Sequence, residues 1–161
     1  MPLVVDASVG LKWVLREPDT PAALRLAGAG EKLLVPDFWL NEACNVLWLQ
    51  VRRKLLTPGE AREGLTLFRE VVEPTPTGHL ALHDVALEIG MTISHPIYDT
   101  LYVAFALAIG AEKVVTADVP FVRAMRTHQN PAMSGMMMSL NEWDCEHTPV
   151  GVAGDSPIIP R

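Results

Sequence analysis

Four carboxylates stand where a short apolar run ends or a helix is expected to begin: Asp6, Glu42, Asp99 and Asp118. In an open parallel α/β sheet the ligand crevice lies outside the carboxyl ends of the strands, so acids that are remote in sequence can converge there. A divalent cation such as Mg²⁺ takes oxygen ligands from one or two such carboxylates and from substrate phosphate. A bound metal also lowers the pKa of its water and so supplies a nucleophile. The four acids therefore predict metal-dependent phosphodiester chemistry.

Each of the four acids also has a purely structural interpretation. Asp99 can cap a helix, Asp118 can initiate the turn before Pro120, Asp6 can end a strand in a turn, and Glu42 can be an exposed helical carboxylate. Taken together, the acids favour a shared site, because the apolar strands before Asp6 and Asp118 should be neighbours near the switch point of the sheet.

Two small hydroxyls, Ser8 and Thr116, each lie two residues from an acid. Hydroxyls near crowded carboxylates can orient waters or ligands. The same residues also fit an ST-turn or a helix cap, in which the hydroxyl bonds only to nearby backbone. Both interpretations remain open for Ser8 and Thr116.

Three further side chains near Asp99 are candidates of a weaker kind. A single histidine ahead of a proline, as at His95, is more typical of a loop than of a general base. Tyr98 and Tyr102 flank Asp99 and could stack on a nucleic-acid base, although aromatic residues at helical spacing are more typical of a core.

The composition predicts one globular domain with a real core, since the chain has 161 residues of which 49% are hydrophobic. Cys44 and Cys145 lack a CxxC spacing and are expected to be free thiols. The start of the chain has no basic and then apolar signal pattern, and the apolar run 101–111 is shorter than the roughly 20 residues that span a bilayer. We expect a soluble, cytoplasmic protein.

The formal net charge of −6 argues against a protein that holds nucleic acid by bulk electrostatics, because phosphate binding favours an excess of Lys and Arg. It does not exclude a nucleic-acid enzyme, since acids gathered around cations account for part of the charge. The basic cluster Arg52-Arg53-Lys54 can face phosphate, or it can be a solvated helix end that the macrodipole favours.

Short apolar runs alternate with helical patterns along the chain. Strands are expected at residues 3–5, 33–35, 71–72, 114–116 and 136–138, with a short extended piece at 91–93. Helices are expected at residues 8–15, 22–27, 40–51 with Asp37 as the cap, 58–70 after the capping box that starts at Thr57, 79–89, 100–109 and 121–125. This alternation predicts a mostly parallel sheet that is covered by helices on both faces.

The segments VVDASVGLKWVL, VPDFWLNEACNVLW, HPIYDTLYVAFALAIGA and KVVTADVPFVRAM resemble, in order, the motifs of PIN-domain ribonucleases, and most closely the VapC-type toxins of toxin–antitoxin pairs. The resemblance runs from about residue 3 to residue 125. It implies a PIN-like three-layer α/β/α sandwich with a mostly parallel central sheet. It also implies an Mg²⁺- or Mn²⁺-dependent endoribonuclease, a homodimer and neutralisation by a cognate antitoxin.

The resemblance assigns roles residue by residue. The catalytic and metal-binding acids are Asp6 of the first strand, Glu42 of NEACN, Asp99 of YDTLY and Asp118 of TAD, with Ser8 and Thr116 as supporting hydroxyls. The nuclease domain is expected over residues 1–143. Residues 144–161 are expected to form a Gly/Pro-rich C-terminal tail. The family pattern explains neither this tail nor the methionines of residues 133–138. These methionines fit a core edge strand better than a surface that binds a partner.

Two other functions compete with this hypothesis. A phospho-acceptor receiver domain is also doubly wound, but it needs adjacent acids after the first strand and a lysine after a late strand, whereas this chain has a single acid and Thr-Ala-Asp. A non-catalytic PIN-like module that binds RNA or a partner is separated from the enzyme by sequence only through the four intact acids, which favour activity. For the homodimer, some of the large apolar residues of the early helices are expected at a two-fold interface and the others in packing: Trp13, Phe38, Trp39 and Trp48.

Overall fold

A five-stranded parallel sheet forms the centre of the protein in the computed structural model, which describes residues 2–148. The strand order is β3-β2-β1-β4-β5. The strands are β1 Leu3–Val5, β2 Leu33–Pro36, β3 Pro74–Thr75, β4 Lys113–Thr116 and β5 Met137–Ser139. Strands β1 and β4 consist mainly of buried β-branched residues, as expected for strands that are covered on both faces. The predicted mostly parallel sheet is confirmed.

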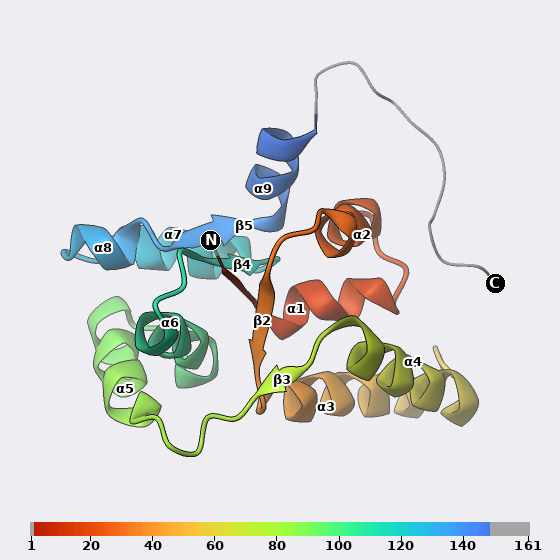
Figure 1. The fold of residues 1–161 in the computed structure, drawn as a ribbon. Coiled ribbons are helices and arrows are strands. Elements are labelled where there is room, and N and C mark those ends of the chain that lie inside the picture. The colour runs from red at the N-terminus through yellow and green to blue at the C-terminus, as the bar shows by residue number, and fades with distance from the viewer. Residues whose placement is uncertain (1, 149–161) are drawn as a thin grey trace.

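Helices cover both faces of this sheet, so that the molecule has the three layers of an α/β/α sandwich (Figure 1). They are α1 Ala7–Gly10, which continues as the 3₁₀ turn η1 Leu11–Trp13, α2 Thr20–Gly28, α3 Trp39–Arg52, α4 Pro58–Val71, α5 Leu82–Ile93, α6 Ile97–Ile109, α7 Val119–Arg126, α8 Pro131–Ser134 and α9 Leu140–His147. Helices α5 and α6 lie on one side of β1 and β2, and α1 to α4 lie on the other side (Figure 1). None of the described helices is long and apolar enough to cross a membrane.

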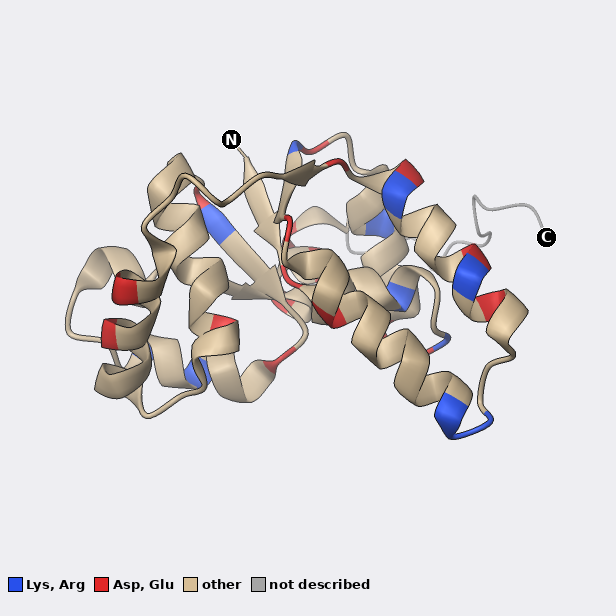
Figure 2. Cartoon of the chain, turned by 90° about the horizontal axis from the view of Figure 1, so that it is seen from below, with Lys and Arg blue, Asp and Glu red and all other residues tan. Residues whose placement is uncertain are grey.

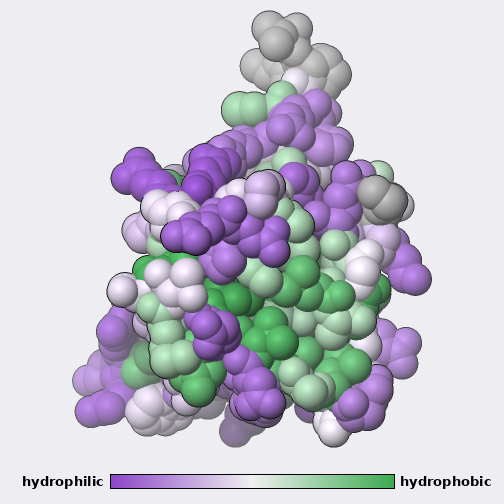
Figure 3. Space-filling view, turned by 90° about the vertical axis from the view of Figure 1, so that its left-hand side faces the viewer, coloured by the Kyte–Doolittle hydropathy of each residue, from purple (hydrophilic) through white to green (hydrophobic). Residues whose placement is uncertain are grey.

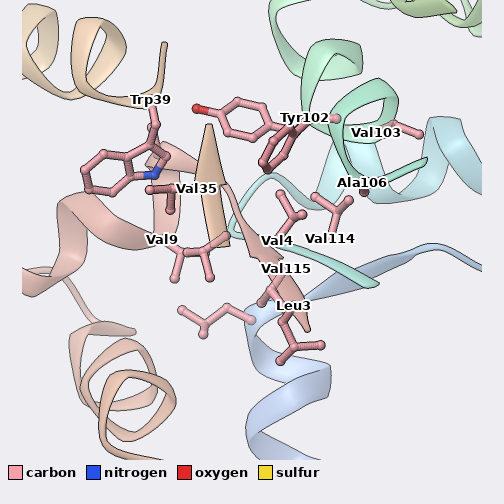
Figure 4. Packing of buried hydrophobic residues seen from close by; sticks show 14 of the residues in the cluster. Leu3, Val4, Val9, Val35, Trp39, Tyr102, Val103, Ala106, Val114 and Val115 are labelled. Carbon is pink, nitrogen blue, oxygen red and sulfur yellow. The ribbon is translucent and has the colours of Figure 1, made fainter. Parts of the chain in front are cut away.

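The core consists of two apolar packing zones, one against each face of β1 (Figure 4). On one side Trp39 packs with its ring centroid 6.0 Å from Trp13 and 5.0 Å from Phe68. This approach needs a glycine at position 10, because a Cβ there would stand 2.0 Å from Trp39 Cζ2. On the other side α6 contributes an almost wholly buried face, which fixes the orientation of its first turn relative to the strand ends.

Several local predictions are confirmed. The capping box of α4 is complete, since Thr57 Oγ1 accepts from the Glu60 N–H and the Glu60 carboxylate accepts from the Thr57 N–H. Helix α6 ends at Gly110, whose φ of 66° is a left-handed conformation that favours glycine. The described cysteines are free thiols, half-buried Cys44 and exposed Cys145.

Three element predictions are wrong. Val71 ends helix α4, and the third strand is instead Pro74–Thr75, where an edge position tolerates a proline. Residues 91–93 are the last turn of α5, because the α5 face that includes Gly90 continues to pack against α6. Asp37 does not cap α3; its carboxylate accepts hydrogen bonds from the N–H and the hydroxyl of Thr77 across the sheet edge.

The predicted domain boundary after Trp143 falls inside helix α9, which extends to His147. Ser139 and Glu142 form a second capping box at its start. Asp144 accepts two hydrogen bonds of 2.7 Å from Arg25 of α2, so the beginning of the predicted tail belongs to the folded domain. The Gly/Pro-rich part of the tail, residues 149–161, lies outside the described residues.

The large aromatic residues of the early helices differ in their exposure. Trp13 and Trp39 are buried in the core of the single chain. Phe38 is half-buried beside this core, and its ring packs against the ring of Tyr102. Trp48 is 53% exposed on α3, with the Arg52 guanidinium 5.5 Å from its ring centroid. Trp13 and Trp39 are therefore packing residues, and of the three tryptophans of the early helices Trp48 stays a candidate for the predicted interface.

Candidate active site

Asp6 is fixed at the end of β1 by two hydrogen bonds that use both of its carboxylate oxygens. Oδ1 accepts from the Ser8 N–H at 2.8 Å, which caps α1, and Oδ2 accepts from the Thr116 hydroxyl at 2.8 Å. The residue is only 3% exposed. Burial raises the pKa of Asp6 to about 6, against the lowering effect of these hydrogen bonds, and the nearby Asp99 raises it further.

The hydroxyls of Ser8 and Thr116 connect the ends of the neighbouring strands β1 and β4. They lie 3.3 Å apart, and Ser8 Oγ accepts from the Ala117 N–H while Thr116 Oγ1 accepts from the Asp118 N–H. Thr116 has a single hydroxyl hydrogen and gives it to Asp6, so Ser8 is the donor between the two hydroxyls. These contacts reach beyond a local ST-turn, because they join segments more than 100 residues apart in sequence.

Glu42 lies in the first turn of α3 and receives a hydrogen bond of 2.8 Å from the Tyr102 hydroxyl to its Oε2. Burial raises the pKa of Glu42 to about 7, and the charges of Asp6 and Asp99 add to this effect against the Tyr102 hydrogen bond. Tyr102 is a core residue, as predicted, but its contact with Glu42 was not foreseen. A buried tyrosine needs a partner for its hydroxyl, and that requirement was the available signal.

Asp99 lies in the first turn of α6, beside His95 and Asp118. Burial raises the pKa of Asp99, while His95 lowers it and Asp118 raises it. Asp118 caps α7, since its Oδ1 accepts from the Phe121 N–H at 2.9 Å. One ligand atom from each of His95, Asp99 and Asp118 can be chosen so that all three lie within 4.8 Å of one another. His95 is therefore a site residue that the sequence pattern did not favour.

The four acids come together at the carboxyl end of the sheet, where each raised pKa includes the charge of another member. Acidic positions gather near the middle of the molecule in Figure 2, whereas most basic positions lie at its periphery. Among the described residues, no Lys or Arg forms an ion pair with any of these acids. The predicted meeting of the β1 and β4 ends is confirmed by the pairing of Val5 with Val115. That all of the acids share one cation stays a prediction.

A groove of about 920 Å³ opens beside Glu42. Its lining includes the amides of Asn41 and Asn45 and the ring of Tyr98, which is 76% exposed. The expectation that Tyr98 belongs to the core is wrong, because position 98 faces outward from the first turn of α6. Tyr98 thus presents an aromatic face to the groove next to the acids.

Residues 3–126 match the PIN domain family. The chain belongs to this family. It is 34% identical to Ribonuclease VapC3 of Pyrobaculum aerophilum over 123 residues, which cover 73% of this chain and 90% of the relative. The resemblance to VapC-type PIN ribonucleases is thereby confirmed, and the matched region contains the strand, helix and loop positions of all four acids.

The fold also resembles a solved crystal structure. The crystal structure of PAE2754 from Pyrobaculum aerophilum superimposes with a TM-score of 0.65 at 19% sequence identity, covering 91% of this chain and 88% of that one. At this identity the likeness supports the fold alone. Together with the family match it confirms the predicted α/β/α sandwich of the PIN domain.

Proposed function

We propose that this PIN domain is a metal-dependent endoribonuclease that acts as the toxin of a toxin–antitoxin pair. The observation that carries the proposal is a set of crowded acids at the sheet end with raised pKa values and without a Lys or Arg partner among the described residues. Mutually repelling carboxylates are unfavourable in the folded chain unless a cation compensates them. The similarity to Ribonuclease VapC3 supports RNA as the substrate.

The donor set fits a divalent cation. Carboxylate oxygens from Asp6, Asp99 and Asp118 are ligands that Mg²⁺ and Mn²⁺ accept, and we expect them with Glu42 to hold the ion, with Ser8 and Thr116 in support. When bound, such an ion activates water and stabilises charge on the phosphate. The two hydrogen bonds to Asp6 hold its carboxylate in one orientation, which is what a ligand requires.

Glu42 is suited to act as a further ligand of the cation. Tyr102 donates to its Oε2 and holds the carboxylate in place. Without metal, burial and the charges of Asp6 and Asp99 raise the pKa of Glu42 to about 7, and a cation bound beside it would favour the ionised form that a ligand needs. In the groove, the exposed ring of Tyr98 and the amides of Asn41 and Asn45 fit an unpaired base, which RNA-binding sites stack on aromatic rings.

The decisive experiment is cleavage of total cellular RNA by the purified chain with Mn²⁺, with Mg²⁺ and with excess EDTA, followed by mapping of the RNA ends. We expect defined internal cuts that need the metal. Asp99→Asn should abolish them, whereas Asp84→Asn should not. Asp84 is a matched control because it occupies the same third position of its helix, α5, but is exposed.

Two outcomes would favour other functions. RNA binding without cleavage by the wild-type chain would favour the non-catalytic module, and full activity of Asp99→Asn or in EDTA would contradict metal catalysis. A receiver domain no longer competes, because the chain belongs to the PIN family and Thr-Ala-Asp follows β4 where a receiver needs a lysine.

The chain should act as a homodimer in the cytoplasm and be neutralised by an antitoxin encoded beside it. Support for an interface comes from the side of the molecule on which α5 and α6 lie, where a continuous apolar area is exposed (Figure 3). Apart from Tyr98, which lines the groove, the exposed large apolar residues of these helices are Val85, Leu87, Met91 and Ile97. An exposed apolar area of this kind marks an interaction site in a soluble protein.

Light scattering at micromolar concentration tests the dimer, and a double variant Leu87→Glu, Met91→Glu should give a monomer. A wild-type monomer would refute the dimer.

Expression in a host tests the toxin role, since the wild type should arrest growth and Asp99→Asn should not. Harmless expression of a wild type that cleaves RNA in vitro would argue against the toxin role alone.

A further inference from the structure

The turn between α5 and α6 holds His95 in one place. Helix α5 ends at Ser94, whose φ of 55° is left-handed and turns the chain back over the helix. The His95 N–H donates to the Gly90 carbonyl at 3.0 Å, and a Cβ on Gly90 would stand only 2.9 Å from the His95 carbonyl oxygen. Pro96 then fixes the start of α6. The backbone thus places the imidazole beside the first turn of α6, where Asp99 lies.

The imidazole is packed but its Nε2 is unsatisfied. The ring stacks on Phe121 with centroids 4.7 Å apart and planes inclined by 19°, and the side chain is 16% exposed. Nε2 lies 2.9 Å from Asp99 Oδ2, but the geometry is not that of a hydrogen bond, and this buried nitrogen has no hydrogen-bond partner among the described residues. A buried polar atom without a hydrogen-bond partner is unfavourable, so it calls for a ligand.

The distances around Nε2 suit a metal ion. The ligand atoms of His95, Asp99 and Asp118 lie within 4.8 Å of one another. Metal–nitrogen and metal–oxygen bonds of about 2.0–2.2 Å place two ligand atoms at most about 4.4 Å apart, on opposite sides of one ion. Small side-chain movements would therefore close the group around a cation. The donor set would be one imidazole nitrogen and two carboxylates.

We propose that His95 is a direct ligand of the catalytic cation together with Asp99 and Asp118, and that its nitrogen makes this site prefer Mn²⁺ to Mg²⁺. Mg²⁺ is bound almost entirely through oxygen and keeps several waters, whereas imidazole is a ligand of first-row transition metals. This inference rests on the proposed metal-dependent function and adds to it the chemical class of the metal. It also accounts for a buried nitrogen that lies 2.9 Å from Asp99 Oδ2 without hydrogen-bond geometry, since a ligand nitrogen points at the ion between the two groups.

Pulsed electron paramagnetic resonance of Mn²⁺ bound to the purified chain tests direct ligation, since a coordinated imidazole gives nitrogen-14 modulation of the Mn²⁺ echo. We expect that modulation in the wild type and its loss in His95→Phe, which keeps a ring against Phe121 but removes the nitrogen. His95→Gln is a second variant of smaller volume. His79→Gln, an exposed histidine outside the site, is the control and should keep the signal.

Titration calorimetry with each metal alone tests the preference. Removing even an outer-shell partner of a metal site weakens binding about 10–100-fold, so His95→Phe should raise the Kd for Mn²⁺ at least tenfold. The Kd for Mg²⁺ should change by less than about threefold, since His95 contributes little to an oxygen-bound ion. Thermal melting of the metal-free variants should show that both remain folded.

The outcomes separate this inference from the proposed function. Mn²⁺ bound to the wild type without nitrogen modulation, or an unchanged Mn²⁺ affinity in His95→Phe, would overturn the role of His95 and leave metal-dependent cleavage intact. No Mn²⁺ binding by the wild type would overturn both. Nitrogen modulation that survives in both His95 variants would show that another histidine supplies it, and would likewise overturn the assignment.

Discussion

Asp6 and Asp37 come directly after neighbouring parallel strands, and each accepts hydrogen bonds from one backbone N–H and one threonine hydroxyl. Asp6 takes them from Ser8 and Thr116, and Asp37 takes both from Thr77. The pKa values of the two aspartates shift in opposite directions. The pKa of Asp37 is lowered, chiefly by the Thr77 hydroxyl, whereas burial raises the pKa of Asp6 to about 6.

Burial decides the difference between these two aspartates. The Asp37 carboxylate is exposed at the sheet edge, so its hydrogen bonds stabilise a charge that water already solvates. The Asp6 carboxylate lies between α1 and the end of β4, where equivalent hydrogen bonds do not compensate for the loss of water and for the charge of Asp99. The same local arrangement is a structural link at one strand and a candidate metal ligand at the next.

The largest expected effect that would break this comparison is on catalysis. Asp6→Asn should reduce RNA cleavage by on the order of 10² to 10³-fold, because it removes a charged ligand from the reacting centre. Asp37→Asn should leave cleavage within about twofold of the wild type, since the Asp37 carboxylate is held by Thr77 and not by a residue of the acid site. Single-turnover cleavage in saturating Mn²⁺ measures both. Equal losses in the two variants would contradict the assignment of Asp6.

The next effect concerns stability against pH in the metal-free protein. The pKa values of Asp6 and Glu42 are raised on folding, to about 6 and about 7, so the unfolded state releases its protons at lower pH than the folded state. The free energy of unfolding should therefore fall as pH rises from about 4 to about 7. Because one pKa unit corresponds to about 1.4 kcal/mol, the share of Asp6 is on the order of 3 kcal/mol.

Urea unfolding in EDTA across this pH range measures that fall. Asp6→Asn should flatten the profile and be more stable than the wild type at neutral pH, since a repelling buried charge is gone. Asp37→Asn should keep the wild-type slope there, because a lowered pKa contributes stability that is lost only at more acidic pH. A wild-type stability that is constant from about pH 4 to about pH 7 would show that burial and neighbouring charge do not raise the pKa values of Asp6 and Glu42 in solution.

The smallest expected effect concerns the threonine hydroxyls that donate to the two aspartates, Thr116 to Asp6 and Thr77 to Asp37. Thr116→Val removes the hydrogen bond to Asp6 Oδ2 and the acceptor of the Asp118 N–H, so cleavage should fall about 10–100-fold. Thr77→Val removes the matching bond to Asp37 and should change stability by no more than about 1 kcal/mol, with a smaller loss of cleavage than in Thr116→Val, since Thr77 lines the groove but does not bond to the acids of the site. Parallel measurements of cleavage and melting test the pair. A Thr116→Val enzyme with full activity would reduce Thr116 to a structural role.

The sequence alone was sufficient where local interactions decide the outcome. Strands β1 and β4, the capping box at Thr57 and Glu60, and the end of α6 at Gly110 depend on residues within a few positions of each other, and all were predicted. The order of the elements also determined that the acids after β1 and β4 lie at one end of a parallel sheet.

Only the tertiary structure decided how those local pieces are used. Pro74–Thr75 pairs with β2 because the edge of the sheet is free there. Val71 is instead the last residue of helix α4. His95 and the Tyr102 hydroxyl join the site through the α5–α6 turn and the packing of α6, contacts that no short pattern encodes. Charge and residue type are written in the chain, but the desolvation that separates Asp6 from Asp37 depends on everything packed around each carboxylate, and so on the complete fold.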